Sequence, residues 1–330
     1  MSGTTILGVD GGGSKTLIAV ADASGTVIRM RRGEGINPLD NRRWRADFEA
    51  QFRAFGAVPN LAGAAVALPS YGEVEEISAA QRAATTTALG DIPQRVLNDV
   101  DAAHIGAFAG GPGILILSGT GSMAWARDAG GTSFRVGGWG DLIGDEGSSH
   151  WIGMQVLGLV TRALDGRVDM TGLVDALFDF LRLDRSQAMN SIEGWVAHLG
   201  HARSEIAALA PLVSRLAEAG DAGATGIVNS AAEHLAVHVT TIAKQSRLPL
   251  DWSYAGGTFA SRALLDAVAK KIGTAPKRPV LPPIGGALLC AAKDLDWPVD
   301  EAWIGRLAAS IKQHASPAQA TTADQLQPQP

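Results

Sequence analysis

Cysteine is nearly absent from this chain of 330 residues, which has Cys290 alone. A single cysteine excludes a disulfide within the chain, and it excludes a metal or iron–sulfur site built only from cysteines of one chain. We interpret Cys290 as buried packing, and we expect the protein to reside in a reducing cytoplasm.

The sequence also lacks an excess of positive charge and a long apolar run. Lys and Arg total 28 against 33 Asp and Glu, a net charge of −5, so we expect no nucleic-acid partner. No apolar run approaches the roughly 20 residues of a membrane span, and no charged segment followed by a long apolar one begins the chain. We therefore expect neither a membrane partner nor a secretory signal, and we look for small-molecule chemistry.

Glycine, in contrast, is abundant, and the stretch GVDGGGSKTLIAV, residues 8–20, has three in a row. It is not a P-loop, because Ser14 stands where that motif needs lysine, and it is not a dinucleotide fingerprint, because Thr16 stands where that motif needs its third glycine. The following residues are β-branched and apolar, which predicts a hairpin. Such a turn can offer backbone N–H groups and hydroxyls to a phosphate, and a plain hairpin turn is the alternative.

Asp10 is unusual beside a phosphate site, because its carboxylate would repel the ligand unless a cation lay between them. A Mg²⁺ ion fits this position. Turn formation is the alternative role.

The length favours about two domains, and strands alternate with helices in the first half. We predict an α/β fold with a lobe at 1–110, a second lobe at 111–314 that contains a helical insertion at about 150–246, and a disordered tail at 315–330. The segment ILILSGTGSMAWARD repeats the strand–turn–strand pattern of ILGVDGGGSKTLIAV, which indicates an internal duplication. Within the insertion, residues 205–219 have helical periodicity.

Two further motifs follow predicted strands. In NDVDAA, Asn98 and Asp99 end an apolar strand, where a carboxylate could take the proton of an attacking hydroxyl; helix capping explains the same residues equally well. In the turn SGTGS, which ends at Ser122, backbone N–H groups and hydroxyls could face the first turn across a cleft.

The stretch GGWGDLIGDEGSSHW, residues 137–151, combines glycines with Trp139 and Asp145. This combination is suited to a polyhydroxylated ligand, because these residues can stack on it and form hydrogen bonds with it. The glycine pairs of AGGTFASR and PPIGGALL could bracket an adenosine, or they could pack helices closely on a sheet.

Taken in order, GVDGGGSKT, NDVDAA, SGTGS, GGWGDLIGDEGS and AGG resemble the sugar kinases of the actin, hexokinase and Hsp70 fold. The likeness is to the N-acetylglucosamine and glucosamine kinases grouped with the BadF/BadG/BcrA/BcrD ATPase-like proteins, over residues 5–295. It implies two duplicated ribonuclease-H-like lobes with a cleft between them. It also implies the cofactors ATP and Mg²⁺, transfer of phosphate to the 6-hydroxyl of an amino sugar, and a homodimer.

The resemblance implies a role for each matching residue. Asp10 would organise Mg²⁺, and Asp99 would be the catalytic base. The nucleotide would be held by Gly12, Gly13, Ser14, Lys15, Thr16, Gly119, Thr120, Gly121, Gly256 and Gly257. The sugar would be held by Asn37, Asp99, Ser122, Gly138, Trp139 and Asp145.

Three alternatives stay open. Met123 follows SGTGS where the N-acetylglucosamine kinases carry Asn, so the sequence does not decide between an acetylated and a free amino sugar. A non-catalytic sugar sensor on the same fold often has an added DNA-binding segment, and Asp10 and Asp99 argue for catalysis. An ATPase that activates another partner is the third alternative, and the cysteine content argues against an iron–sulfur cluster there.

Overall fold

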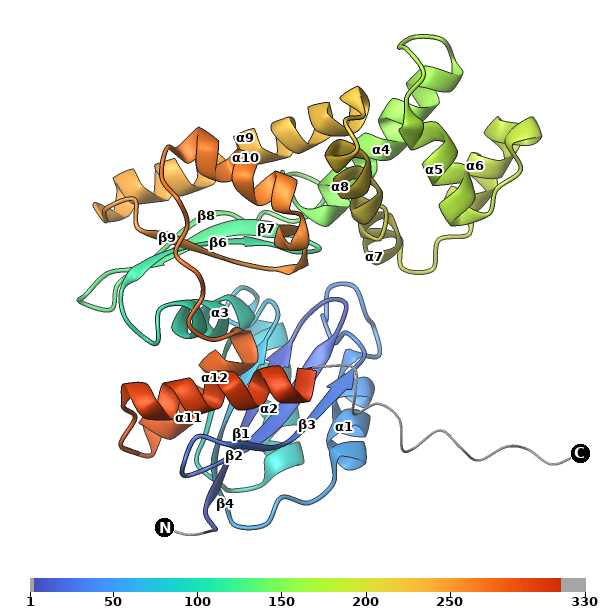
Figure 1. The fold of residues 1–330 in the computed structure, drawn as a ribbon. Helices are drawn as coiled ribbons and strands as arrows, with labels where there is room; N and C mark the ends of the chain where they lie inside the picture. The colour runs from blue at the N-terminus through green and yellow to red at the C-terminus, as the bar shows by residue number, and fades with distance from the viewer. Residues whose placement is uncertain (1–2, 316–330) are drawn as a thin grey trace, which may run out of the picture. The chain divides into compact units, whose positions relative to one another are not determined.

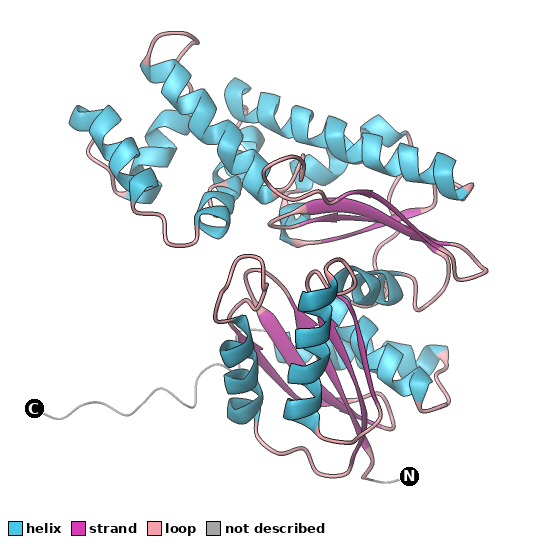
Figure 2. Cartoon of the chain, turned by 180° about the vertical axis from the view of Figure 1, so that it is seen from behind, coloured by secondary structure: helices cyan, strands magenta, loops and turns pink. Residues whose placement is uncertain are grey.

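The structure is a computed structural model that describes residues 3–315. The chain forms two compact units: one is built from residues up to Gly110 and from Val280 onward, and the other is Gly111–Pro279. Each unit combines one β-sheet with helices (Figure 2), as the predicted α/β class requires. Among the described residues, none of the helices has the length and apolarity that crossing a bilayer demands.

The sheet of the first unit has five strands in the order β3-β2-β1-β4-β5. They are β1 (Thr5–Gly11), β2 (Thr16–Asp22), β3 (Val27–Gly33), β4 (Leu61–Leu68) and β5 (Gln94–Asn98). β1 is antiparallel to β2 and parallel to β4, which is parallel to β5. The carboxyl ends of β1, β4 and β5 therefore share one edge of the sheet, where Asp10 and Asn98 lie.

Helices cover both faces of this sheet. They are α1 (Trp44–Phe55), α2 (Glu75–Leu89), α3 (Asp99–Ala107), α11 (Pro283–Asp294) and α12 (Glu301–Ala315). One apolar core includes Phe48 of α1 and Ala84 of α2. The other includes Ile105 of α3 and Leu288 of α11. In Figure 1 the red helices α11 and α12 lie against the blue strands of the first unit.

The assignment of residues 280–314 to the second lobe is wrong, because α11 and α12 belong to the first unit. The physical reason is close helix packing. A β-carbon at Gly286 would lie only 1.9 Å from the carbonyl oxygen of Ala102, so the glycine lets α11 approach the backbone of α3. Packing between helices is thus the role that the structure gives Gly286. Apart from Ala315, the last residue of α12, the predicted tail at 315–330 lies outside the described residues.

The second unit repeats the strand arrangement of the first, with the order β8-β7-β6-β9. Its strands are β6 (Gly113–Ser118), β7 (Ser122–Arg127), β8 (Ser133–Gly137) and β9 (Trp252–Ala255). β6 is antiparallel to β7 and parallel to β9, as β1 is to β2 and β4. The predicted duplication is confirmed by this equivalent order and direction of the strands.

The insertion between β8 and β9 is mostly helical, as expected. Its helices are α4 (Ser149–Leu164), α5 (Gly172–Leu181), the short 3₁₀ helix η1 (Arg185–Gln187), α6 (Ala188–Ala197), α7 (Ala202–Ala207), α8 (Ala210–Glu218) and α9 (Ala222–Ser246). After β9 come the 3₁₀ helix η2 (Gly257–Ala260) and α10 (Arg262–Ile272). The helix expected at 205–219 is two helices, because Pro211 stands in the first turn of α8 and favours a helix start there.

Candidate functional site

The first glycine turn joins β1 to β2 in the predicted hairpin. The N–H of Gly12 donates to the carbonyl of Lys15 at 2.9 Å and closes the turn. Ser14 and Lys15 are exposed, whereas Thr16 is buried and its hydroxyl donates to the carbonyl of Glu34 at 2.8 Å. The turn therefore presents the side chains of Ser14 and Lys15 outward, and Thr16 fixes its base.

Two carboxylates lie at the carboxyl edge of the same sheet. Asp10 is near the end of β1, and Asp99 directly follows β5. Burial raises the pKa of Asp10 to about 6, against the opposing attraction of Lys15. Burial, reinforced by the charge of Asp10, raises the pKa of Asp99 to about 7. A carboxyl group with a pKa near neutrality can take a proton at physiological pH and give it up again.

The hydrogen bonds at the start of α3 show which of the adjacent residues Asn98 and Asp99 caps the helix. Asn98 is the N-cap, because its side-chain oxygen accepts the N–H of Val100 at 3.0 Å. Its amide also donates to the carbonyl of Tyr71 at 2.8 Å. Asp99 accepts the same Val100 N–H at 3.0 Å, through Oδ1. Since Asn98 already caps the helix, the cap does not account for a carboxylate at position 99.

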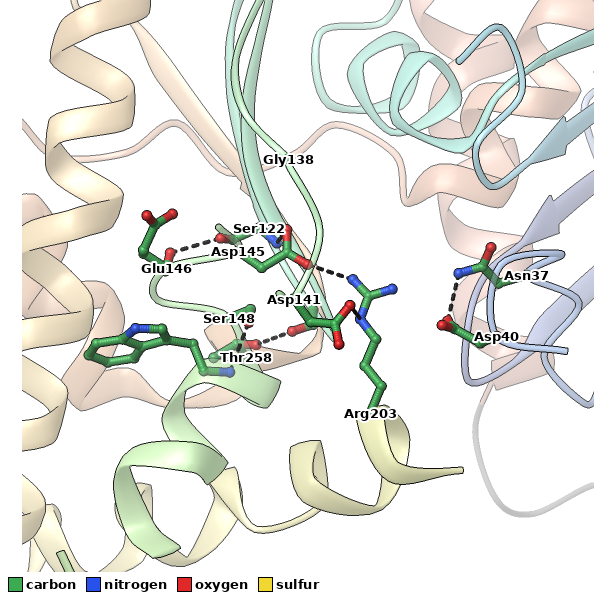
Figure 3. A network of polar contacts seen from close by, with 12 residues as sticks. Asn37, Asp40, Ser122, Gly138, Asp141, Asp145, Glu146, Ser148, Arg203 and Thr258 are labelled. Atoms are coloured by element: carbon green, nitrogen blue, oxygen red, sulfur yellow. Dashed lines mark hydrogen bonds and ion pairs between the residues drawn. The ribbon is translucent and has the colours of Figure 1, made fainter. Parts of the chain in front are cut away.

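Asn37 lies in the loop after β3 and is buried. Its amide donates to Asp40 Oδ2 at 2.6 Å (Figure 3), and its carbonyl oxygen accepts the N–H of Leu39 at 3.2 Å. The two bonds hold the side chain in one orientation, which is what a ligand-binding amide needs.

A cavity of about 740 Å³ in the first unit lies elsewhere. Leu61, the first residue of β4, and Ile92, just before β5, line it with Phe52 and Phe55 of α1. It therefore opens near the amino ends of these strands, away from Asp10 and Asp99. We assign it no part in the site.

In the second unit, the turn between β6 and β7 is tied to two neighbouring segments. The carbonyl of Gly119 accepts the N–H of Ser149, at the start of α4, at 2.8 Å and the hydroxyl of Thr258, in η2, at 3.3 Å. A β-carbon at Gly256 would lie 2.1 Å from the carbonyl oxygen of Ser118, and its φ is +102°. The turn and the AGG motif are thus in direct backbone contact, and glycine is required at 256.

A pocket of about 280 Å³ adjoins this junction. Ser149 and Thr258 line it, together with Gly257 of η2 and Pro211 and Arg215 of α8. The same two hydroxyl residues contact Gly119, so the pocket and the glycine turn are neighbours within the second unit.

The loop at 137–147 is fastened to the same turn by two serines. Ser118 donates to the carbonyl of Gly147 at 2.9 Å, and Ser122 donates to the carbonyl of Glu146 at 2.7 Å. The N–H of Ser122 also donates to Asp145 Oδ1 at 3.3 Å. Two motifs that are separate in the sequence therefore form one structure.

The other predicted sugar-binding residues of this loop differ in exposure. The Trp139 side chain is 71% exposed, whereas Asp145 is 2% exposed and has a φ of +58°, which is uncommon outside glycine. Gly138 lies against the buried side chain of Met123, and its carbonyl accepts a hydrogen bond from Arg135. Trp139 is free to meet a ligand, and Asp145 is held in place.

Arg203 of α7 is the residue that sequence analysis missed. Its guanidinium Nη2 lies 2.6 Å from Asp145 Oδ2, and its Nε lies 3.7 Å from Asp141 Oδ1 (Figure 3). α7 has only six residues and no motif marks it, so the pattern of the sequence held no signal for this pair.

The structure thus gathers the predicted residues in two groups. The first unit brings Asp10, Asp99 and the Gly12–Thr16 turn to one sheet edge, and the second joins the Gly119–Gly121 turn to Ser122, Asp145, Gly256 and Gly257. No group of three or more His, Cys, Asp or Glu able to hold a metal occurs within residues 3–315. A Mg²⁺ ion, however, is usually held by one or two carboxylates with phosphates and water, and the Asp10 carboxylate fits that donor set.

Residues 7–291 match the BadF/BadG/BcrA/BcrD ATPase family. The chain belongs to this family. The resemblance stated from the motifs is therefore confirmed, and it extends across both units.

This chain has curated relatives that are named as sugar kinases. It is 33% identical over 147 residues, 44% of this chain and 47% of the relative, to an N-acetylmuramic acid/N-acetylglucosamine kinase of Clostridium acetobutylicum. It is 30% identical over 196 residues, 54% and 58% of the two chains, to an N-acetyl-D-glucosamine kinase of Dictyostelium discoideum. The chain therefore spans about half the length of these curated relatives.

A solved structure extends the likeness over nearly the whole fold. This protein of Chromobacterium violaceum, described as a candidate N-acetylglucosamine kinase, is 27% identical, with a TM-score of 0.68, over 87% of this chain and 98% of its own. The predicted fold class, with two duplicated α/β lobes of the sugar-kinase type, is confirmed by this likeness and by the two sheets.

Proposed function

We propose that the protein transfers the γ-phosphoryl group of ATP to the 6-hydroxyl of an amino sugar, N-acetylglucosamine or glucosamine. The observation that carries the proposal is Asp99, a carboxylate at the carboxyl edge of the first unit's sheet with a pKa of about 7. Family membership and the names of the relatives support it.

Asp99 is the general base in this proposal. It takes the proton of the sugar 6-hydroxyl as that oxygen forms a bond to the γ-phosphorus, and the bond from the γ-phosphorus to the β-phosphate oxygen breaks to release ADP. A base is most effective when its pKa is near the working pH, because it is then largely ionised and still basic. Burial raises the pKa of Asp99 to about 7, which meets this condition.

Asp10 is the proposed Mg²⁺ ligand. The ion, when bound, neutralises phosphate charge in the transition state. Asp10 lies between the first glycine turn and Asp99 along the sheet edge, so its carboxylate is suited to hold a cation there. The charge of Asp10 also raises the pKa of Asp99, as expected of two carboxylates at one sheet edge.

The nucleotide is proposed to lie in the second unit's 280 Å³ pocket, with its adenosine near Gly256 and Gly257. The turn at Gly119, Thr120 and Gly121 would then face the phosphates; the N–H of Gly119 closes the turn on the carbonyl of Gly121 at 2.8 Å, so the proposed donors are the N–H groups of Thr120 and Gly121. In the first unit the corresponding donors are the turn at Gly12–Thr16, with Ser14 and Lys15 exposed for the purpose.

The sugar is proposed to be held by Asn37, Ser122, Gly138, Trp139 and Asp145, in addition to Asp99. Buried hydrogen bonds fix Asn37 and Asp145, whereas Trp139 is exposed and available for stacking. Met123 is buried against Gly138, and its thioether side chain cannot donate a hydrogen bond to an acetamide. We propose a cytoplasmic location, as the single cysteine favours, and a homodimer, as the family resemblance implies.

The test is the initial rate of ADP release with Mg·ATP and, in turn, N-acetylglucosamine, glucosamine, N-acetylmannosamine and glucose. Asp99→Asn is the control for the base. A rate on one amino sugar that depends on Asp99 supports the proposal and identifies the substrate. Sugar binding without phosphorylation would refute it and favour the sensor alternative, and ATP hydrolysis that ignores every sugar would favour an ATPase acting on another partner.

A further inference from the structure

Asp145 forms a buried ion pair with Arg203, a residue outside the predicted motifs. Arg203 Nη2 is 2.6 Å from Asp145 Oδ2, and the two side chains are 18% and 3% exposed (Figure 3). A carboxylate is costly to bury without a partner. Arg203 therefore gives the buried Asp145 carboxylate a cationic partner.

Close approaches at two glycines allow Arg203 to reach Asp145. A β-carbon at Gly153 of α4 would lie 2.1 Å from the carbonyl oxygen of Ile206, so only glycine lets the backbone of α7 come so close to α4. A β-carbon at Gly121 would lie 2.8 Å from Arg203 Nη2 and 2.9 Å from Asp145 Oδ2. Two glycines from different elements thus make room for a single ion pair.

Hydrogen bonds from Arg203 and Ser122 together fix both oxygens of the Asp145 carboxylate. Oδ2 accepts from Arg203, and Oδ1 accepts the N–H of Ser122 at 3.3 Å. An ionised carboxylate has about four lone-pair positions, so each oxygen keeps one for a further donor. Two adjacent hydroxyls of a sugar ring provide two donors at a suitable separation.

The backbone of Asp145 adds a reason for this support. Its φ of +58° is unfavourable for a residue with a side chain, and Asp141 brings a second carboxylate to within 3.7 Å of Arg203 Nε. Arg203 thus lies between two carboxylates of one loop and connects both to α7.

We propose that Arg203 is a positioning residue for the sugar: it holds the Asp145 carboxylate in one orientation, and so sets the affinity for the sugar without touching the reacting atoms. This inference rests on the proposed function, in which Asp145 binds the sugar. It predicts a specific kinetic signature, because the loss of a ground-state contact raises KM while the chemical step proceeds at nearly its normal rate.

The decisive variant is Arg203→Met, assayed with the amino sugar that the wild type phosphorylates. We expect the KM for the sugar to rise about 10- to 100-fold, as misplacement of a binding group does, with kcat changed less than about threefold and the KM for ATP unchanged. Arg203→Lys keeps the charge but not the two-pronged geometry, so it should restore part of the affinity. Arg185→Met is the matched control, because Arg185 pairs with Asp175 on the same insertion at an exposed position.

A double-mutant cycle separates support of Asp145 from an independent role. If Arg203 acts through Asp145, the pair Asp145→Asn with Arg203→Met should have the same sugar KM as Asp145→Asn alone. Multiplication of the two effects would refute the proposal. So would a fall in kcat at constant sugar KM, which would place Arg203 at the transferred phosphoryl group.

Two further variants keep the test valid if Arg203→Met does not fold. Gly153→Ala leaves every charge in place but moves α7, so it should also raise the sugar KM, whereas a wild-type KM in both Gly153→Ala and Arg203→Lys would overturn the inference. Sugar affinity measured by calorimetry distinguishes it from the proposed function. Wild-type binding that weakens in Arg203→Met, without phosphorylation by either, refutes the kinase and supports the positioning role; no binding by the wild type refutes both.

Discussion

Replacement of Asp99 by Asn should stabilise the protein and inactivate it at the same time. Asp99 has a pKa of about 7 instead of the usual 3.8, mainly because it is buried. The folded state therefore holds this proton more tightly than the unfolded state, and the free energy of unfolding falls as pH rises from about 4 to about 7. Above pH 7 the carboxyl is ionised in the folded state as well, and the free energy of unfolding is lowered by the full cost of that ionisation.

The size of this cost follows from the shift. About three pKa units correspond to about 4 kcal/mol if the group were wholly shielded from water. Asp99 is partly exposed, so solvent screening reduces the expected gain in Asp99→Asn to about 1–2 kcal/mol at pH 8. The amide keeps the oxygen that accepts the N–H of Val100, so the helix start is preserved.

The assay is thermal unfolding of the ligand-free protein at pH 8 and at pH 4, followed by tryptophan fluorescence. We expect the variant to unfold about 2–8 °C above the wild type at pH 8, and the difference to shrink toward pH 4, where both states bind the proton. The exposed Asp91→Asn is the control and should leave unfolding unchanged at both values. In the same samples kcat should fall about 10²- to 10⁴-fold. Equal stability of variant and wild type at pH 8 would refute the argument that burial poises this carboxyl.

Three other predictions use independent parts of the molecule. Asp10→Ala should raise the Mg²⁺ concentration needed for half-maximal activity, and an unchanged Mg²⁺ titration would rule out Asp10 as a ligand. Burial raises the pKa of the Cys290 thiol to about 11, so at pH 8 only about one molecule in a thousand carries the thiolate. The native protein should therefore react with a thiol-directed dye far more slowly than the unfolded protein. Comparable rates would contradict the buried placement of Cys290. Gly256→Ala should lower the unfolding temperature and weaken ATP binding, because its β-carbon would fall 2.1 Å from the Ser118 carbonyl oxygen; normal nucleotide affinity in calorimetry would show that the two turns are not coupled.

Much of the fold follows from local sequence pattern. Alternating apolar and turn residues specify the strands around Asp10 and around Ser118, because strand pairing in a hairpin depends on neighbours only a few residues away. The repeat of that pattern predicted the equivalent order of the two sheets. The resemblance carried by the motifs gave the family, which the match over residues 7–291 confirms.

The sequence pattern could not place what depends on packing between distant segments. The return of α11 to the first unit is decided by the close approach at Gly286, a contact with Ala102 across 184 positions of the chain. Proline in α8 divides a helical pattern that periodicity alone joined at 205–219.

The sequence by itself determined the α/β class, the duplicated hairpins and the residue types available for chemistry, because these depend on local propensity and on motif spacing. Tertiary structure alone decided that Asn98 is the residue that caps α3 and that Arg203 meets Asp145. The physical reason is the same in both cases. Burial, pKa and ion pairing are properties of a residue's surroundings in space, and those surroundings come from elements that the chain brings together only when it folds.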